Sequence, residues 1–384
     1  MNATGTLPGF FAGSQSLEIV GYQLRTGHDT NEPRSLATLF MKTGVLLINL
    51  GTPDAPQTAE VRRYLRQFLS DPRVLDMPAP IRWLLVNLVI TPRRAPASAE
   101  AYRKVWTDRG SPLYYHLIDL CAGLREALPE VIFEVGMRYG SPSIATGLNA
   151  LRTQGCDRIL VAPLYPQYAS SATGTALEAV YREASKLWNT PYIQVLPAFY
   201  DDPHFLDAFA ALGKEVLDEF KPDHVLFSYH GLPERHCTKS DDSGAHCLRS
   251  ANCCERMVAA NQSCYRAQCF ATTKGLRERL MLDESNSSIS FQSRLGRTPW
   301  IQPYTDKVLV DLPAQGVKRL AVYCPTFVAD CLETLEEIEM RGAEDFLKAG
   351  GEELRLIPSL NASPAWVAGL AAMFNPLLAL SPEL

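Results

Sequence analysis

Short apolar runs alternate with amphipathic segments along most of the chain. Continuous apolar runs predict buried strands, and apolar positions three and four residues apart predict helices. The predicted strands cover residues 45–50, 131–137, 158–163, 192–196, 224–228 and 319–323. The clearest predicted helices between them cover residues 62–69, 143–153 and 176–188. Because apolar strands separated by helices are typical of parallel sheets covered on both faces, the pattern predicts an α/β fold.

This alternation restarts near residue 198, which indicates two similar doubly wound, Rossmann-like domains over residues 41–197 and 198–384. The end of the second domain could pack back on the first. Residues 1–40 are weakly patterned, so we expect a flexible extension, or an upstream start that the cell does not use. In doubly wound folds ligands bind at the carboxyl ends of the strands. Polar residues that directly follow strands are therefore the candidate functional residues.

Composition narrows the class of protein. With 46% hydrophobic and 21% charged residues, the 384-residue chain has the balance of a folded, soluble enzyme. Its net charge of -5 argues against a protein that binds nucleic acid through a basic surface. No apolar run approaches the ~20 residues that span a bilayer, and no signal peptide is recognisable. We therefore expect a cytoplasmic protein.

One apolar segment interrupts the pattern. Residues 81–90 are almost entirely apolar and are followed by Arg93 and Arg94. The segment could be a buried core helix. It could also be an exposed apolar lip, within residues 77–96, that rests on a bilayer or admits an apolar ligand. The sequence leaves both interpretations open.

A histidine follows one of the predicted strands. His230 comes after the strand 224–228, and Gly231 and Pro233 turn the chain directly behind it. An isolated histidine is often structural, but a strand-end position aims this side chain at the ligand crevice. Histidine suits proton abstraction near neutral pH or ligation of a divalent metal.

Three carboxylates follow another predicted strand. Glu333 and Glu337 lie four residues apart, so they would share one face of an α-helix, and Asp330 lies one turn before them. They could form a solvated acidic helix start, which the helix dipole favours. A line of carboxylates opposite a histidine could instead pass a divalent cation or carry protons. Neither glycine-rich phosphate-loop motif is present, which disfavours a nucleotide enzyme.

The cysteines are unevenly distributed. Six of the ten fall within residues 237–269, here called the cysteine insert: Cys237, Cys247, Cys253, Cys254, Cys264 and Cys269. In a cytosolic enzyme such a cluster indicates a metal centre more often than disulfides. The insert contains no Cys-x2-Cys pair, so a zinc ribbon is a poor match. Free thiols or an adventitious zinc site remain as the alternative.

Several ordered blocks identify a family. They are residues 47–53 (LINLGTP), 109–113 (RGSPL), 163–168 (PLYPQY), 227–233 (FSYHGLP), 291–296 (FQSRLG), 299–300 (PW) and 330–335 (DCLETL). On these blocks the chain resembles the ferrochelatases from about Val45 to about Pro364. The resemblance implies a lyase that inserts Fe(II) into protoporphyrin IX with release of two protons, the last step of haem biosynthesis. It also implies the two-domain fold inferred above.

The resemblance assigns roles to particular positions. His230 and Glu333 match the proposed iron-binding and proton-handling pair. Glu337 matches a further acid on the same helix, which in the family is distorted toward a π-helix. The lip segment matches the cover of the porphyrin pocket, which favours peripheral membrane contact through residues 81–90. The positions that line the pocket are matched by Ser111, Arg138, Tyr139, Ser171 and Trp300.

Two departures bear on the substrate. Cys331 stands where some relatives carry a second histidine, so any role of that histidine is absent. Leu50 stands where coproporphyrin-type members carry tyrosine, which favours protoporphyrin IX over coproporphyrin III or another tetrapyrrole. A non-catalytic tetrapyrrole or iron–sulfur protein is the alternative from another class, and the presence of His230 and Glu333 argues against it. Members of the family occur as monomers and homodimers, so the resemblance leaves the oligomeric state open.

Some microbial ferrochelatases carry a [2Fe-2S] cluster on a cysteine-rich segment, and the resemblance extends this cofactor to the cysteine insert. Such a cluster takes four thiolates. We favour Cys247, Cys254, Cys264 and Cys269, with Cys253 competing with Cys254. Because the proton-handling residues lie elsewhere, we expect a structural or redox-sensing role for the cluster.

Overall fold

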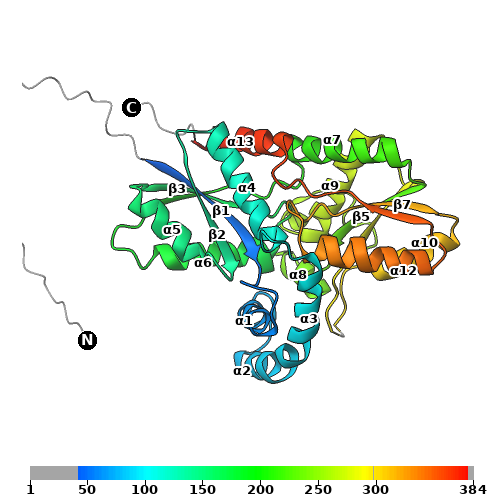
Figure 1. Ribbon diagram of the computed structural model, residues 1–384, viewed down its shortest axis with the longest axis horizontal. Helices are drawn as coiled ribbons and strands as arrows, with labels where there is room; N and C mark the ends of the chain where they lie inside the picture. The colour runs from blue at the N-terminus through cyan, green and yellow to red at the C-terminus, as the bar shows by residue number, and fades with distance from the viewer. Residues whose placement is uncertain (1–41, 297, 379–384) are drawn as a thin grey trace, which may run out of the picture. The chain divides into compact units, whose positions relative to one another are not determined.

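The computed structural model describes residues 42–296 and 298–378 (Figure 1). The chain separates into residues 1–40 and a compact unit of residues 41–384. The expectation of a flexible extension over residues 1–40 falls outside the described residues.

Two four-stranded parallel sheets form the framework. The first contains β1 (Thr43–Gly51), β2 (Ile132–Tyr139), β3 (Arg158–Pro163) and β4 (Tyr192–Val195) in the order β2-β1-β3-β4. The second contains β5 (His224–His230), β6 (Ser287–Gln292), β7 (Arg319–Tyr323) and β8 (Glu353–Leu356) in the order β6-β5-β7-β8. The two orders are the same permutation, so the predicted α/β class with two similar doubly wound sheets is confirmed.

Helices connect the strands. The chain order in the first half is α1 (Thr58–Leu69), α2 (Ala79–Leu84), η2 (Leu85–Ile90), α3 (Thr91–Val105), α4 (Pro112–Ala127), α5 (Ile144–Thr153), η3 (Ser170–Gly174) and α6 (Thr175–Ala184). The rest are α7 (Pro203–Phe220), α8 (Glu234–Lys239), η4 (Ala259–Asn261), α9 (Tyr265–Leu280), α10 (Thr305–Ala314), α11 (Leu332–Thr334), η5 (Leu335–Gly342), α12 (Ala343–Lys348) and α13 (Pro364–Leu378). Of the η segments, η4 is a 3₁₀-helix and the others are π-helices.

The central strand β1 shows why its sequence is apolar without alternation. Both of its faces are covered, so Val45 and Leu47 pack into one core cluster with side chains of α4, and Leu46 and Ile48 pack into another with side chains of α5. All four side chains are fully buried. Strands covered on both faces require this continuous apolar run.

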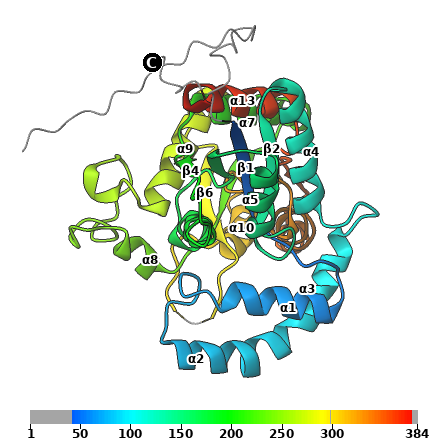
Figure 2. The same cartoon turned by 90° about the vertical axis from the view of Figure 1, so that its left-hand side faces the viewer.

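The last helix joins the two halves. Helix α13 packs against both α4 and α7, which lie beside it in Figures 1 and 2. Its Trp366 is fully buried beside Phe199 and Phe205. Near its end, the Leu377 carbonyl accepts a hydrogen bond from the Arg158 guanidinium of β3 at 2.7 Å.

The apolar lip segment is exposed. The exposed fractions of Ile81, Trp83 and Leu88 are 56%, 59% and 63%, whereas Val86 is fully buried. The interpretation as a buried core helix is therefore wrong, because only one side of α2 and η2 contacts the rest of the protein. Both views show α2 at the end of the structure opposite α13 (Figures 1 and 2). Among the described residues, no helix combines the length and apolar character needed to cross a bilayer.

Candidate active site

His230 is the last residue of β5, so this strand ends two residues later than the sequence pattern predicted. Its neighbour in β6 is Gln292, whose carbonyl accepts a hydrogen bond from the Gly231 N–H at 2.8 Å. The Nδ1 atom of His230 lies 2.7 Å from the Gly231 carbonyl oxygen. Because a carbonyl can only accept, this contact places the proton of the neutral ring on Nδ1 and leaves the lone pair on Nε2.

Aromatic rings flank this imidazole. The ring centres of Trp300 and Phe327 lie 6.5 Å and 6.3 Å from that of His230. Trp300 is itself fixed, since its indole N–H donates to the Leu295 carbonyl at 2.9 Å. His230 therefore stands beside apolar aromatic rings at the carboxyl edge of the second sheet.

The helix that carries the two glutamates changes from α-helical to π-helical geometry between them. Glu333 lies in the short turn α11, and Glu337 lies in the π-helix η5, so the distortion expected from the family resemblance is confirmed. The Gln292 side-chain amide donates to the Glu333 carbonyl at 2.9 Å and to the Glu337 carboxylate at 3.4 Å. One side chain, on the strand beside His230, thus connects the backbone of Glu333 and the carboxylate of Glu337 to the sheet edge.

Ser293 holds the Glu337 carboxylate. Its backbone N–H donates to Glu337 at 2.9 Å, and its hydroxyl donates to the other oxygen. Ser293 has φ of 65°, in the left-handed region that residues other than glycine rarely adopt. Such backbone conformations concentrate at functional sites, where the surrounding structure offsets their cost.

Asp330 does not extend this line of carboxylates. It is buried, and its oxygens accept hydrogen bonds from the Thr334 hydroxyl at 3.0 Å and the Asn361 amide at 2.8 Å. The backbone N–H of Ser359 donates to it as well. The expectation of a solvated acidic start is wrong for Asp330, which joins the loop before α11 to the loop after β8.

The first half of the chain also reaches Glu333. Burial, and to a smaller extent the nearby Glu333 carboxylate, raise the pKa of Tyr64 and Tyr102 far above its usual range. The Tyr64 hydroxyl donates to the Gly51 carbonyl at the end of β1, at 3.2 Å. The carboxyl edge of the first sheet is therefore close to the carboxylates that follow the second sheet. Neither tyrosine stands at a strand end, so the sequence offered no signal for them.

Ser111, Arg138 and Tyr139 lie at the carboxyl edge of the first sheet. The Ser111 hydroxyl is buried and accepts from the Thr52 hydroxyl at 2.8 Å. Arg138 and Tyr139 end β2, and their polar atoms contact Asp71 at 2.6 Å and 2.9 Å. Ser171 lies half-buried in η3, after β3, and Trp300 follows β6.

Asp71 organises this corner and was missed from the sequence. Besides Arg138 and Tyr139, it accepts hydrogen bonds from the Thr175 hydroxyl and the Arg73 backbone N–H. Burial alone would raise the pKa of Asp71, but these hydrogen bonds and the Arg138 charge hold it below its ordinary value. The residue follows α1 in a Ser-Asp-Pro turn, so sequence reasoning would class it as turn chemistry.

The cysteine insert brings four thiols together. The neighbouring thiols of Cys237, Cys254 and Cys247 lower the pKa of Cys264. All four side chains are buried. The Arg266 guanidinium donates to Cys254 Sγ at 3.1 Å, which adds a positive charge to this thiol group.

The remaining two cysteines of the insert are placed differently. Cys253 Sγ lies 3.7 Å from Cys254 Sγ and accepts from the Leu248 backbone N–H at 3.4 Å. The Cys269 thiol is fully buried in α9, and burial raises its pKa. Cys237 is among the thiols that lower the pKa of Cys264, whereas Cys269 is not.

Two buried polar side chains hold the insert. Asp241 accepts hydrogen bonds from the backbone N–H groups of His246 and Cys247 at 2.8 Å and 2.9 Å. Asn261 is fully buried and donates to the Cys253 carbonyl at 3.0 Å. Within the described ranges, no three or more His, Cys, Asp or Glu side chains are arranged around a single metal ion.

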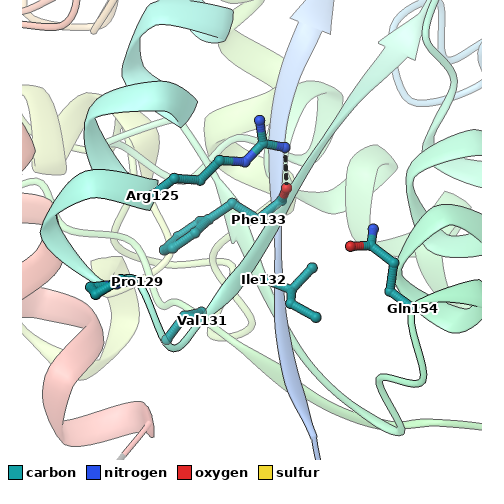
Figure 3. A pocket seen from close by; sticks show the side chains of 6 residues that line it. All are labelled: Arg125, Pro129, Val131, Ile132, Phe133 and Gln154. Carbon is teal, nitrogen blue, oxygen red and sulfur yellow. Dashed lines mark hydrogen bonds between the residues drawn. The ribbon is translucent and has the colours of Figure 1, made fainter.

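A surface pocket of about 300 Å³ lies elsewhere (Figure 3). It is lined by Arg125, Pro129, Val131, Ile132, Phe133 and Gln154. The Arg125 guanidinium is already engaged, since it donates to the Phe133 carbonyl at 2.6 Å. These residues surround the amino end of β2, whereas the candidate site adjoins its carboxyl end. The pocket is thus separate from the site.

Among solved structures, SirB from Bacillus subtilis with Fe3+ has the same fold, with a TM-score of 0.51 and 15% sequence identity over 88% of this chain and 96% of that chain. The family model for ferrochelatase matches residues 42–377. The chain therefore belongs to the ferrochelatase family.

Curated relatives support the same assignment. A protein of Coxiella burnetii named ferrochelatase is 49% identical over 86% of this chain and 93% of its own length. A ferrochelatase of Azotobacter vinelandii is 50% identical over 86% of this chain and 97% of its own. One from Bdellovibrio bacteriovorus is 46% identical over 86% and 98%.

Proposed function

We propose that the protein is a lyase that inserts Fe(II) into protoporphyrin IX to give protohaem, the last step of haem biosynthesis. Membership of the ferrochelatase family over residues 42–377 is the observation that carries this proposal. The site chemistry agrees with it, since a histidine whose Nδ1 faces the Gly231 carbonyl stands at the same sheet edge as two glutamates. Fe(II) and the porphyrin are the substrates.

The reaction requires removal of two protons. Two pyrrole N–H bonds break, Fe(II) forms bonds to the four ring nitrogens, and two protons leave. We assign the first acceptor to His230 Nε2, because Nδ1 is occupied by the Gly231 carbonyl. Glu333 and Glu337 then carry the protons toward solvent. The same imidazole and carboxylate groups are ligands that Fe(II) accepts, so they can also hold the metal before insertion.

Porphyrin binding would fall to the residues around this base. Trp300 and Phe327 offer apolar surface beside His230, and such walls can hold a macrocycle bent while binding energy offsets the strain. Ser111 and Ser171 stand at the opposite sheet edge. Arg138 and Tyr139 support that edge through Asp71, so their contribution is to its shape.

Separate measurements of turnover and porphyrin binding test the catalytic assignment. We expect His230→Ala and Glu333→Gln each to lower kcat at least about 100-fold, the lower bound for loss of a general acid or base. The porphyrin Kd, measured by fluorescence quenching, should change less than about three-fold. His204→Ala, an exposed position on α7, is the control. Retained turnover in His230→Ala would overturn the role of His230, and a wild type without turnover would indicate a binding protein.

Substrate choice needs its own assay. Because Leu50 replaces the tyrosine expected in coproporphyrin-type relatives, kcat/KM should be higher for protoporphyrin IX than for coproporphyrin III. The reverse order would identify coproporphyrin III as the substrate. In that case the Leu50→Tyr variant should also have the higher kcat/KM for coproporphyrin III.

We further propose that the cysteine insert holds a [2Fe-2S] cluster. The donor types fit: Cys237, Cys247, Cys254 and Cys264 are buried in one core cluster, the first three of them lower the pKa of Cys264, and the Arg266 guanidinium adds positive charge. This arrangement supports Cys237, Cys247, Cys254 and Cys264 as ligands, in place of the set with Cys269. When bound, such a group supplies one-electron redox chemistry.

The two ligand sets are distinguished by paired variants. Anaerobically purified wild type should show broad visible absorption that dithionite bleaches, with iron and acid-labile sulfide in equal amounts. Cys237→Ser should lose these bands, and Cys269→Ser should keep them. The opposite result would restore Cys269 as the ligand, and a colourless wild type with bound zinc would replace the cluster by a zinc site.

We also propose that the protein is cytoplasmic and that its lip segment contacts a membrane surface. Exposed Trp83 and Leu88 offer apolar area, and the exposed Arg93 and Arg94 add positive charge. Leu88→Asp should reduce co-sedimentation with anionic vesicles. The control, Leu347→Asp, also replaces an exposed leucine, but on α12, and should leave co-sedimentation unchanged. Equal binding by both variants would refute this contact.

A further inference from the structure

Asp76 connects the lip segment to helix α8. It lies in the loop between α1 and α2, and its carboxylate accepts from Arg235 Nε at 2.6 Å and from Lys239 Nζ at 2.6 Å. His236 Nε2 stands 3.7 Å away. The Asp76 side chain is only 14% exposed. All three basic groups belong to α8, which lies next to this loop in Figure 2.

The opposite face of α8 belongs to the cysteine insert. Arg235 and Lys239 are four residues apart and share one face of the helix. Cys237 lies two residues from each, which is about 200° around a helix of 3.6 residues per turn. Its side chain is buried in the core cluster that also contains Cys264. A single helix of six residues thus has the insert on one side and Asp76 on the other.

The loop around Asp76 continues this connection on both sides. The Arg82 guanidinium of α2 donates to the carbonyls of Leu75 and Met77 at 3.2 Å and 2.8 Å. At the other end of the loop, Asp71 pairs with Arg138 at the carboxyl edge of the first sheet. Displacement of Asp76 would therefore reach both the lip helix and the edge of the candidate site.

We infer that Asp76 is a positioning residue that transmits the arrangement of the cysteine insert to the lip segment and thereby sets porphyrin affinity. The part about affinity rests on the proposed function, in which the lip covers the porphyrin. Metal insertion itself does not pass through Asp76, because His230, Glu333 and Glu337 have separate supports.

The direct test is Asp76→Asn, which keeps the size of the side chain and removes its charge. Backbone hydrogen exchange of residues 79–90 should become faster, measured on the full chain without substrate. The KM for protoporphyrin IX should rise about ten-fold, the effect of losing one charge-assisted interaction, while kcat stays within about two-fold. Asp207→Asn removes another aspartate that pairs with an arginine, Arg279 at 2.5 Å, and should change neither quantity.

A double-mutant cycle tests the connection to the insert. Cys237→Ser should also accelerate exchange in residues 79–90, but should add little in the Asp76→Asn background, because the path is already broken. Arg235→Gln offers the same test from the other side if Asp76→Asn does not fold. Additive effects, or an Asp76→Asn protein with unchanged exchange and KM, would overturn the inference. Exchange in the substrate-free protein does not depend on the reaction, so this failure is distinct from failure of the proposed function.

Discussion

Replacement of Asp71 by asparagine should destabilise the protein more than any surface charge change. Asp71 is buried, and its carboxylate accepts from the Arg138 guanidinium, the Tyr139 hydroxyl, the Thr175 hydroxyl and one backbone N–H. Oxygen Oδ2 alone receives all three side-chain donors. If the asparagine NH2 took that place, a donor would face the three donors that now point at Oδ2. If the asparagine oxygen took it, that oxygen would carry no charge to balance Arg138.

The size of the effect follows from the burial of the partner. The Arg138 side chain is 12% exposed and that of Asp71 3% exposed, so the substitution leaves a buried guanidinium without its counter-charge. Breaking a buried pair from one side costs about 3–5 kcal/mol. We take the lower end, about 3 kcal/mol, because the Thr175 hydroxyl and carbonyl still accept from Arg138 Nε.

Urea unfolding at several pH values is the assay. Because its folded pKa is lowered, Asp71 stabilises the wild type above the unfolded pKa of about 3.9, and this contribution is lost as the pH falls through the folded pKa. Asp71→Asn should therefore lose stability at neutral pH and lack this acid dependence. The control, Asp54→Asn, breaks an exposed pair with Arg63 and should change little. Equal free energies of unfolding for the two variants would refute the reasoning.

Three further outcomes are expected. Gly51→Ala should destabilise the protein by more than about 3 kcal/mol, since φ is 123° and a Cβ would lie 1.8 Å from a carbonyl oxygen of β2. Gly316→Ala, with φ of 93° and open space around it, should cost about 1 kcal/mol. Thermal unfolding measures both effects. Ser293→Ala removes a hydroxyl bond to Glu337 and should lower kcat about ten-fold without changing the porphyrin KM, with a shifted pH–rate profile. Burial lowers the pKa of His224, so the unfolded chain binds more protons below about pH 6.5 and stability falls as the pH drops; His224→Gln should flatten urea midpoints between pH 7 and 5.

Local patterns predicted most, but not all, of the sheet framework. Each predicted strand is present, because strands buried on both faces are marked by continuous apolar residues. The strands β6 and β8 were not predicted. The sequence of β6, SSISFQ, is rich in serine, and these hydroxyls are satisfied by partners distant in sequence: Ser290 by Thr305 and Ser288 by His224. No local pattern contains that information.

The candidate site divides in the same way. His230 was identified because it follows an apolar strand, and Glu333 because it follows another. Asp71 could not be identified, since its function depends on Arg138, 67 residues away. The choice between Cys237 and Cys269 also depends on tertiary structure, because spacing along the insert does not show which thiols meet at Cys264.

The two halves have the same topology but contribute different chemistry at their facing edges. Around the end of β1, the first half offers hydroxyl groups and buried tyrosines whose raised pKa values keep them protonated, so they can donate hydrogen bonds but cannot take up protons. Around the end of β5, the second half offers an imidazole lone pair and carboxylates. In the proposed mechanism the protons of the ring therefore leave through His230 and the carboxylates of the second half. We expect the first half to determine how the ring is held, because Asp71 and Asp76 fix the parts of the chain beside the candidate site.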